Sequence, residues 1–129
     1  MSFASERRYI NLPTRQAPLP FSDAVLVGET LYLAGRIGLD PATGLVPADM
    51  QEELNLLFGG LKAVLAQADM TMDDLVWVQV FSSDMTLWER FNVEYLKHFS
   101  RDLPARAFLG SGPLFKGARF EINGIAVRG

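Results

Sequence analysis

The stretch PADMQEELNLLFGGLKAVLAQADM, residues 47–70, sets the hydrophobic period on which the fold depends. Its apolar residues recur every three or four positions, which predicts one buried face along a helix of about six turns. That face consists of Met50, Leu54, Leu57, Phe58, Leu61, Val64, Leu65 and Ala68. We expect Pro47 near the first helical position and Asp49 in the first turn, where an acid complements the helix dipole. Gly59 and Gly60, in mid-helix, indicate close packing on a sheet.

Strands are predicted on both sides of this helix. The β-rich runs before it are 7–10, 24–28 and 30–37, and Gly28–Glu29 between the last two predicts a hairpin. After it the period predicts a buried strand at 75–82, a second helix at 86–99, and strands at 105–111 and 118–127. Thr86, with Glu89 three positions later, fits a capping box at the start of the second helix.

The resulting order, β-β-β-α-β-α-β-β, predicts a single α+β domain over residues 1–129. Two helices with one apolar face each would pack on one side of a mixed sheet. The strands are also too apolar for their other face to lie comfortably in water, which indicates oligomerisation through that face.

Composition excludes several classes of protein. The chain is 49% hydrophobic and 21% charged, as globular proteins are, and its net charge of −3 offers no basic excess for nucleic acid or an anionic membrane surface. No apolar run approaches the roughly 20 residues of a membrane span. The first residues lack the pattern of a signal peptide, so we expect a cytoplasmic protein.

The chain has no cysteine and one histidine, His98, which limits its chemistry. Disulfides, thiolate nucleophiles and a zinc site with two histidines of one chain are all excluded. We therefore expect neither a metal nor a cofactor. His98 falls in the last turn of the second predicted helix, where the helix dipole favours a cationic side chain.

An arginine interrupts the apolar segment LPARAFLGSGPL, residues 103–114. Strand alternation would place Phe108 and Gly110 on the same face as Arg106. Arginine suits two-pronged capture of a carboxylate. The plainer alternative is an arginine at a strand start that snorkels to water or pairs with an acid.

Glu121, in ARFEINGIAV at 118–127, is a second candidate, and alternation places it on the face of Arg119 and Asn123. Facing water or pairing with Arg119 is the plain interpretation, whereas a partly buried glutamate could hold or activate a water molecule. Asn92 could donate a hydrogen bond to a ligand or simply lie at the edge of the buried face of its helix.

These residues, in this order, resemble the Rid (RidA/YjgF) family of small imine and enamine deaminases, whose members are often labelled endoribonuclease L-PSP. The likeness spans nearly the whole chain. It is carried by LYLAGRIGLDPATGLVPADM (31–50), LKAVLAQADMTMDDLVWVQVF (61–81) and PARAF…FEINGIAV (104–127). It implies a chorismate-mutase-like fold and a homotrimer with a central barrel, with ligand sites in clefts between subunits.

The resemblance also implies roles for individual residues. Arg106 matches the arginine that grips the substrate carboxylate, and Glu121 matches the glutamate that positions a water molecule. Gly35 matches a glycine in the strand that lines the pocket, and Asn92 matches a helix residue near it. The implied substrates are small 2-enamino and 2-imino acids such as 2-aminoacrylate, hydrolysed to 2-keto acids and ammonia.

Four positions depart from the best-studied members. Phe21 replaces a tyrosine, Arg36 a glutamine, Phe108 a cysteine and Phe115 a proline. The loss of a hydroxyl at Phe21, a narrower pocket at Phe108 and an added charge at Arg36 would alter the preferred substrate.

Two rival functions remain open. One is a non-catalytic trimer that binds small carboxylates. The other is an endoribonuclease, against which the negative net charge and the lack of a basic track with stacking aromatic residues argue.

Overall fold

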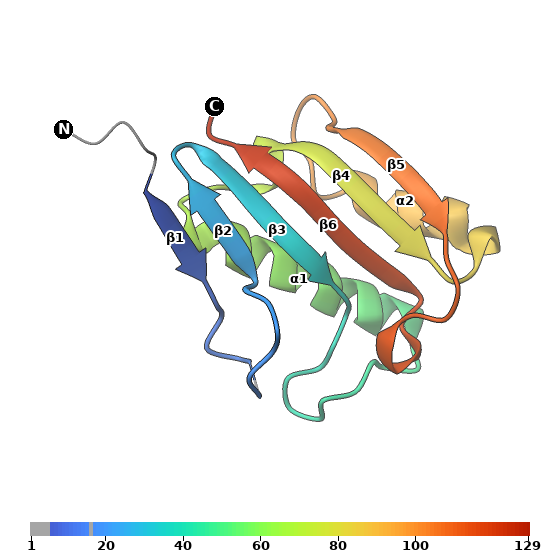
Figure 1. The fold of residues 1–129 in the computed structure, drawn as a ribbon. Coiled ribbons are helices and arrows are strands. Elements are labelled where there is room, and N and C mark those ends of the chain that lie inside the picture. Colours follow the sequence, from blue (N-terminus) through green and yellow to red (C-terminus); the bar gives the residue numbers. More distant parts are fainter. Residues whose placement is uncertain (1–5, 16) are drawn as a thin grey trace.

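The computed structural model describes residues 6–15 and 17–129. Residues 1–5, on which the expectation about a signal peptide partly rests, lie outside this range. A six-stranded sheet has the order β1-β2-β3-β6-β4-β5 and forms the front layer in Figure 1. The strands are β1 (Arg7–Ile10), β2 (Ala24–Val27), β3 (Thr30–Arg36), β4 (Leu75–Ser82), β5 (Ala105–Gly110) and β6 (Phe120–Val127). Neighbours pair antiparallel except β4 and β5, which are parallel, so the sheet is mixed.

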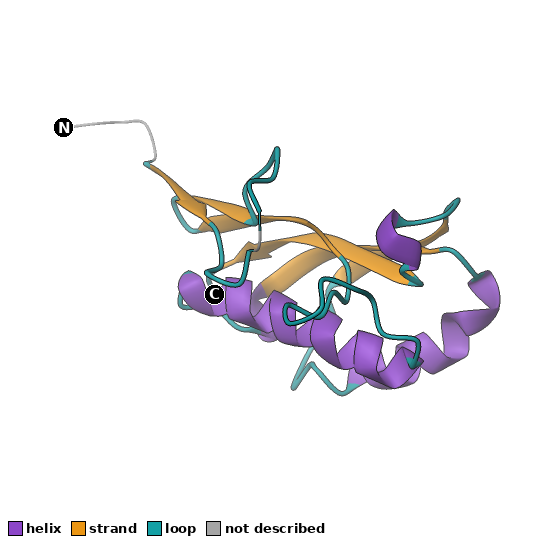
Figure 2. Ribbon diagram, turned by 90° about the horizontal axis from the view of Figure 1, so that it is seen from below, coloured by secondary structure: helices purple, strands orange, loops and turns teal. Residues whose placement is uncertain are grey.

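Two helices, α1 (Met50–Gln67) and α2 (Trp88–Leu96), lie on the same side of the sheet (Figure 2). Short 3₁₀ turns precede β4, α2 and β6, at Met72–Asp74, Met85–Leu87 and Phe115–Gly117. The predicted α+β arrangement is therefore confirmed, and the predicted ranges agree closely with these bounds. Within the described residues, neither helix has the length and apolar character needed to cross a membrane.

Both predicted helix starts need correction. Asp49 is the N-cap of α1 and accepts a 3.0 Å hydrogen bond from the Glu52 amide, so Pro47 precedes the helix. The capping box at Thr86 is wrong, because Thr86 lies within a 3₁₀ turn that the carboxylate of Asp84 caps. Asp84 provides the side-chain acceptor for the backbone amides at the start of this turn, so Thr86 does not act as the cap.

The core lies between the helices and the sheet. Side chains that alternate along β3, β4 and β6 meet the apolar stripe of α1, as the period predicted. The fully buried residues include Leu31, Leu57, Leu65, Val80, Phe91 and Phe120. Burying such a side chain stabilises the fold by about 1.5–3 kcal/mol. This packing fixes β4, β5 and β6 relative to α2, where the candidate site residues lie.

The opposite face of the sheet, called here the open face, is covered by neither α1 nor α2 (Figure 2). One row of side chains crosses it: Tyr9 pairs with Val25, Val25 with Tyr32, Tyr32 with Ile125, and Ile125 with Trp77. Directly opposed residues point to the same face. Tyr9 and Tyr32 are 60% and 50% exposed, so a single chain leaves an apolar surface uncovered.

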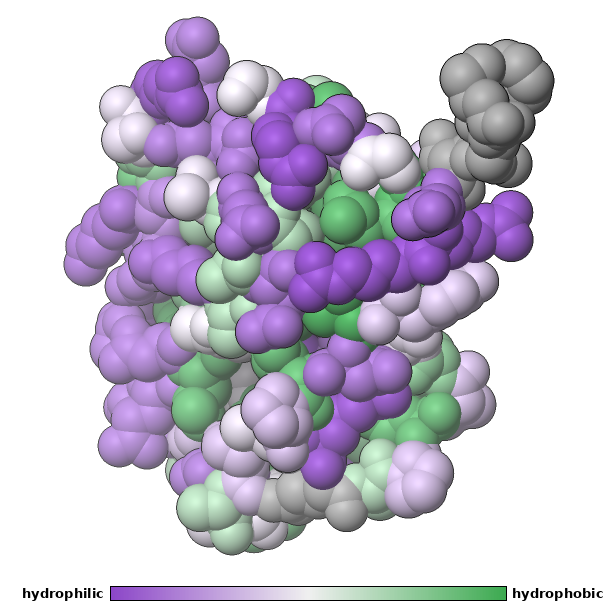
Figure 3. Space-filling view, turned by 90° about the vertical axis from the view of Figure 1, so that its left-hand side faces the viewer, coloured by the Kyte–Doolittle hydropathy of each residue, from purple (hydrophilic) through white to green (hydrophobic). Residues whose placement is uncertain are grey.

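Strand β1 forms one edge of the sheet. The side of the molecule on which it lies presents hydrophilic side chains over much of its surface, with hydrophobic areas between them (Figure 3). Arg7 and Arg8, both exposed, lie on this four-residue strand. Short, charged edge strands resist pairing with further strands, so β1 is a poor site for edge-to-edge association.

Candidate active site

Arg106 lies on β5, the edge strand opposite β1, with its side chain on the face covered by the helices. In the parallel pairing of β4 and β5 it lies opposite Val78, and Phe108 lies opposite Val80. Val78 and Val80 are both buried beneath the helices. The predicted shared face of Arg106 and Phe108 is therefore confirmed.

Aromatic rings surround the Arg106 guanidinium. Its Cζ atom lies 4.6 Å from the ring centre of Tyr95, 5.1 Å from that of Trp88 and 5.5 Å from that of Phe108. Trp88 and Phe108 themselves meet edge to face at 5.0 Å. Such cation–π contacts stabilise by about 0.5–2 kcal/mol each. The ion pairs found among the described residues include none with Arg106, so its charge is held in place by rings without being neutralised.

A cavity of about 300 Å³ opens beside this guanidinium, lined by Asn92, Tyr95, Leu96, Leu103, Pro104 and Arg106. Three of these residues have a buried polar atom without a hydrogen-bond partner: Asn92 Oδ1, Tyr95 Oη and Arg106 Nη1. A buried polar group left unpaired costs about 1–3 kcal/mol. Several of them at the wall of one cavity indicate a site that a polar ligand completes.

Tyr95 was missed by the sequence reasoning. Burial raises the pKa of Tyr95 to about 12, although the nearby Arg106 opposes the rise. The hydroxyl therefore keeps its proton at neutral pH and is available as a donor. No local signal in the sequence separates this tyrosine from a core aromatic residue, because its neighbours Phe91 and Phe99 are core aromatics as well.

A larger cavity, of about 380 Å³, lies beyond the C-terminal ends of α1 and α2. Lys62, Asp73, Lys97 and His98 are among its lining residues. The Asp73 carboxylate is already occupied by the amide and hydroxyl of Ser100, with the amide at 2.9 Å. Size favours this cavity, but it has one unpaired buried polar atom among its lining residues, His98 Nδ1, against three beside Arg106, and this difference decides the assignment.

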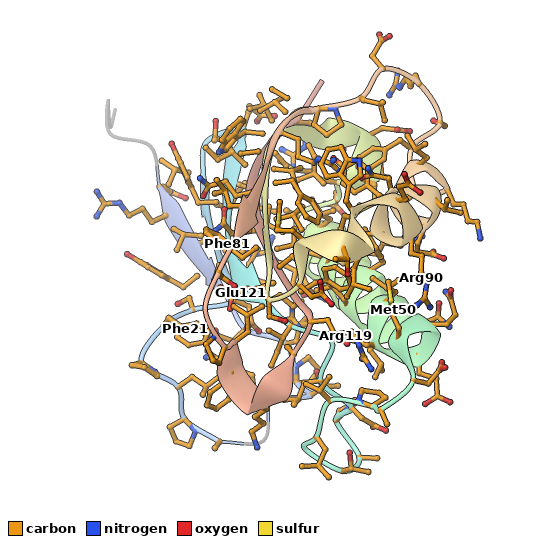
Figure 4. The ribbon with its side chains drawn as sticks, turned by 90° about the vertical axis from the view of Figure 1, so that its right-hand side faces the viewer. Phe21, Met50, Phe81, Arg90, Arg119 and Glu121 are labelled. Carbon is orange, nitrogen blue, oxygen red and sulfur yellow. The ribbon has the colours of Figure 1, made fainter. Side chains whose placement is uncertain are left out.

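Glu121 lies on the open face. On β6 it is opposite Phe81 of β4, and Figure 4 shows both residues on the side of the sheet away from α1. A Cβ atom placed at Gly35 of β3 would come within 2.4 Å of Glu121 Oε2. The carboxylate therefore rests against the bare backbone of Gly35, and these two predicted site residues are neighbours.

Arg119 does not share the face of Glu121, which corrects the alternation prediction. It precedes β6 and turns to α1, where its Nη1 lies 2.6 Å from Oε1 of Glu53 and its amide donates to Oε2 at 2.7 Å (Figure 4). Glu53 is fully buried, so it requires this cationic partner. Of the two plain interpretations of Glu121, the pair with Arg119 is therefore wrong, whereas a side chain that faces water is not contradicted.

Phe21 lies in the loop before β2 and is 48% exposed. The guanidinium of Arg15 lies 5.4 Å from the centre of its ring. Phe21 is on the same side of the sheet as Glu121 in Figure 4. Phe108, in contrast, flanks the Arg106 guanidinium and packs on Phe91 at 5.5 Å, and it is not among the residues that line the cavity.

Arg36 adds no charge near Arg106 or near Glu121, contrary to expectation. A register shift in β3 between Leu33 and Arg36 turns its side chain toward α1, where it meets Asp23 at 3.4 Å. Burial lowers the pKa of Arg36, and Asp23 partly restores it. A Cβ atom at Gly60 would lie 2.9 Å from the Arg36 side chain, whereas a Cβ atom at Gly59 would have no atom within 4 Å. The predicted close packing therefore holds for Gly60 alone.

The predicted residues thus fall into two groups on opposite faces of the sheet. The guanidinium half contains the predicted residues Arg106, Asn92 and Phe108 on the helix-covered face, together with Tyr95, which was not predicted. The carboxylate half contains Glu121 and Gly35 on the open face, with Phe21 in the loop on that side. The sheet lies between the two halves because they are on opposite faces. Along the sheet, β4 also separates β5, which carries Arg106, from β6, which carries Glu121.

Fold and cavity together define a small α+β protein whose cavity wall carries an arginine that has no acidic partner among the described residues. The chain matches the family model for endoribonuclease L-PSP over residues 14–128 and belongs to that family. Relatives from Bos taurus and Mus musculus, each named 2-iminobutanoate/2-iminopropanoate deaminase, are 36% and 37% identical over 122 residues. These matches cover 92% of this chain and 89% and 90% of the relatives. A Yersinia pestis structure, titled a protein of unknown function of the conserved Rid protein family, has a TM-score of 0.88 at 29% identity and covers 95% of this chain and 100% of its own. The family resemblance is confirmed.

Proposed function

We propose that this protein is a hydrolytic deaminase of small 2-imino and 2-enamino acids, which it converts to 2-keto acids and ammonia. The observation that carries the proposal is the Arg106 guanidinium, fixed by three rings beside a cavity and free of any acidic partner in the described chain. The activity named for the bovine and mouse relatives supports the same chemistry.

In the proposed reaction the guanidinium binds the substrate carboxylate through two hydrogen bonds and places positive potential beside the imine carbon. Glu121 holds a water molecule and takes one of its protons as the oxygen adds to that carbon. Glu121 passes that proton to the nitrogen, which completes the tetrahedral adduct. The adduct hydroxyl then gives up its proton, the nitrogen receives it, the C–N bond breaks, and ammonia leaves as the carbonyl forms. Enamines enter after tautomerisation to imines. The reaction uses neither a metal nor a cofactor.

This chemistry needs two copies of the chain, because Arg106 and Glu121 lie on opposite faces of the sheet. We infer that the guanidinium half of one copy faces the carboxylate half of the next. The charges of the two halves are opposite, and neither Arg106 nor Glu121 has an ion-pair partner among the described residues. Joining them would also cover the apolar row on the open face.

Head-to-tail contacts of this kind use different surfaces on the two partners, and they close into a ring when the rotation between neighbours allows closure. The resemblance to the Rid family implies a ring of three, with the open faces lining a central barrel. Three copies of the 14.3 kDa chain give a particle of about 43 kDa. In this arrangement Phe21 and Gly35 of one copy would complete the pocket beside Asn92 and Arg106 of its neighbour.

Carboxylate binding without turnover is the second candidate function, since the guanidinium half can bind a carboxylate on its own. Cleavage of RNA, which the family description suggests, has less support. The net charge of −3 disfavours a polyanion.

A coupled assay tests the proposal. A pyridoxal-phosphate threonine dehydratase generates 2-iminobutanoate, and the release of 2-oxobutanoate and ammonia is followed with and without this protein. We expect acceleration by the wild type and by Arg90→Ala, which changes an exposed arginine of α2. Arg106→Ala should lose the acceleration. Equal rates with and without the wild-type protein would contradict the proposal.

A further inference from the structure

We infer that Tyr95 is a substrate-binding residue whose hydroxyl donates a hydrogen bond to the carboxylate held by Arg106. This inference rests on the proposed function, because it requires a carboxylate at the guanidinium. It assigns a role to a residue that neither the strand pattern nor the family resemblance indicated.

The position of the Tyr95 ring is fixed from several sides. The Arg106 guanidinium lies 4.6 Å from its centre, and the rings of Phe91 and Phe99 lie 5.8 Å and 4.8 Å away. Only 4% of the residue is exposed. The hydroxyl therefore cannot swing out to solvent, and it must find its partner inside the cavity.

The unpaired atoms of the cavity match the polar groups of an imino acid. Tyr95 Oη and Arg106 Nη1 are donors without acceptors, and Asn92 Oδ1 is an acceptor without a donor. Asn92 precedes Tyr95 by three residues on α2, so both side chains lie on the same face of the helix. A substrate carboxylate would accept from Tyr95 and Arg106, and the imine N–H would donate to Asn92.

Protonation of the hydroxyl agrees with this role. Since the pKa of Tyr95 is raised to about 12, its hydroxyl stays protonated at neutral pH and remains a hydrogen-bond donor. An anionic acceptor beside it would also be attracted by the uncompensated charge of Arg106. A neutral acceptor or a water molecule would be attracted less strongly, because it carries no net negative charge.

The experiment uses Tyr95→Phe, which removes one oxygen and keeps the ring beneath Arg106. Binding of 2-oxobutanoate, a non-reactive carboxylate probe, is measured by titration calorimetry. We expect the Kd to rise roughly 10- to 150-fold, the value for losing a hydrogen bond to a charged group. KM for 2-iminobutanoate should rise with little change in kcat, since ground state and transition state share the carboxylate contact.

Arg90→Ala is the control, because it changes an exposed residue of α2 that does not line the cavity. It should leave Kd and KM unchanged. The Tm of Tyr95→Phe should equal or exceed that of the wild type, because the change removes a buried hydroxyl without a partner. A purely structural hydroxyl would lower the Tm instead.

The outcomes separate the inference from the proposed function. Wild-type Kd in Tyr95→Phe, or weakened binding with a lowered Tm, would overturn the role of Tyr95 while leaving the proposed function intact. Failure of the wild type itself to bind 2-oxobutanoate, with no effect of Arg106→Ala, would overturn both.

Discussion

Arg106 and Glu121 are fifteen positions apart in the chain, yet they point to opposite faces of one sheet. Their partners on β4 explain the separation: Arg106 lies opposite Val78, and Glu121 opposite Phe81. Residues at even and odd positions of one strand face opposite ways. The proposed mechanism, in which Arg106 binds the substrate and Glu121 holds the water, therefore requires a second copy to supply one of the two residues.

Arg106→Ala should lower kcat/KM for 2-iminobutanoate by roughly 30- to 4,000-fold. Truncating one partner of a buried charge pair costs about 2–5 kcal/mol, and about 1.4 kcal/mol corresponds to a factor of ten. Arg106→Lys should recover little, because an ammonium cannot form the two-pronged contact. Steady-state kinetics with in situ imine supply the numbers, and Arg90→Ala is the control. Near-wild-type turnover by folded Arg106→Ala would show that the arginine only fills space among the rings.

Gly35→Ala should lower kcat while the fold persists. The new methyl group would lie 2.4 Å from the present position of Glu121 Oε2, so the carboxylate must move away from its water site. A shift of about 1 Å at a catalytic group can cost about 100-fold in rate. Glu121→Gln should have the same kinetic signature, with binding of 2-oxobutanoate largely preserved in both variants.

Gly59→Ala is the matched control for this change. No atom lies within 4 Å of a Cβ atom at Gly59, and alanine is favoured over glycine in a helix by about 1 kcal/mol. It should raise the Tm and leave kcat unchanged. If Gly35→Ala retains full kcat, the water held by Glu121 is not part of the reaction.

The sequence predicted every strand and both long helices, because each carries a clear hydrophobic period. It also predicted the shared face of Arg106 and Phe108. Alternation failed for Arg119, because the strand begins at Phe120 and the buried Glu53 draws the arginine to α1. It could not anticipate the register shift that turns Arg36 away from the open face.

The site was less accessible to sequence reasoning than the fold. The role inferred for Tyr95 depends on the rings and the cavity around it, which arise from segments far apart in the chain. Trp88 looked like an ordinary apolar helix residue, and only the packing of β5 brings Arg106 over its ring. The faces of Arg106 and Glu121 followed from strand pairing, which a hydrophobic period alone does not specify.

Stability should depend on pH through His98, the one histidine of the chain. Burial lowers the pKa of His98, and the 2.7 Å contact with Glu94 only partly offsets this. The unfolded chain therefore binds a proton more readily than the folded one. Stability contributed by neutral His98 is complete above the unfolded pKa, near 6.5, and is lost as the pH falls toward the lower folded pKa.

We accordingly expect the Tm to fall between pH 7.5 and pH 5.5, and His98→Gln to show a flatter profile. Glu94 does not add to this fall in Tm. Burial would raise the pKa of Glu94, but hydrogen bonds from Gln51 and His98 outweigh burial and lower it, so Glu94 stays ionised over this pH range. Thermal denaturation at several pH values and equal ionic strength provides the comparison. Identical slopes for the two proteins would contradict the assignment to His98.

The division of the site between two copies is tested most directly by mixing inactive variants. Arg106→Ala and Glu121→Gln are purified separately, unfolded and refolded together in equal amounts. Mass spectrometry of the native assemblies confirms that mixed rings form. If each site takes Arg106 from one copy and Glu121 from its neighbour, as proposed, random mixing leaves about one site in four with both residues intact.

The account predicts that the mixed assemblies recover up to about a quarter of wild-type deaminase activity, while each variant alone stays inactive. If both residues act from the same chain, no chain in the mixture has an intact pair, and mixing restores nothing. Mixed rings that remain as inactive as the separate variants would therefore contradict the shared site.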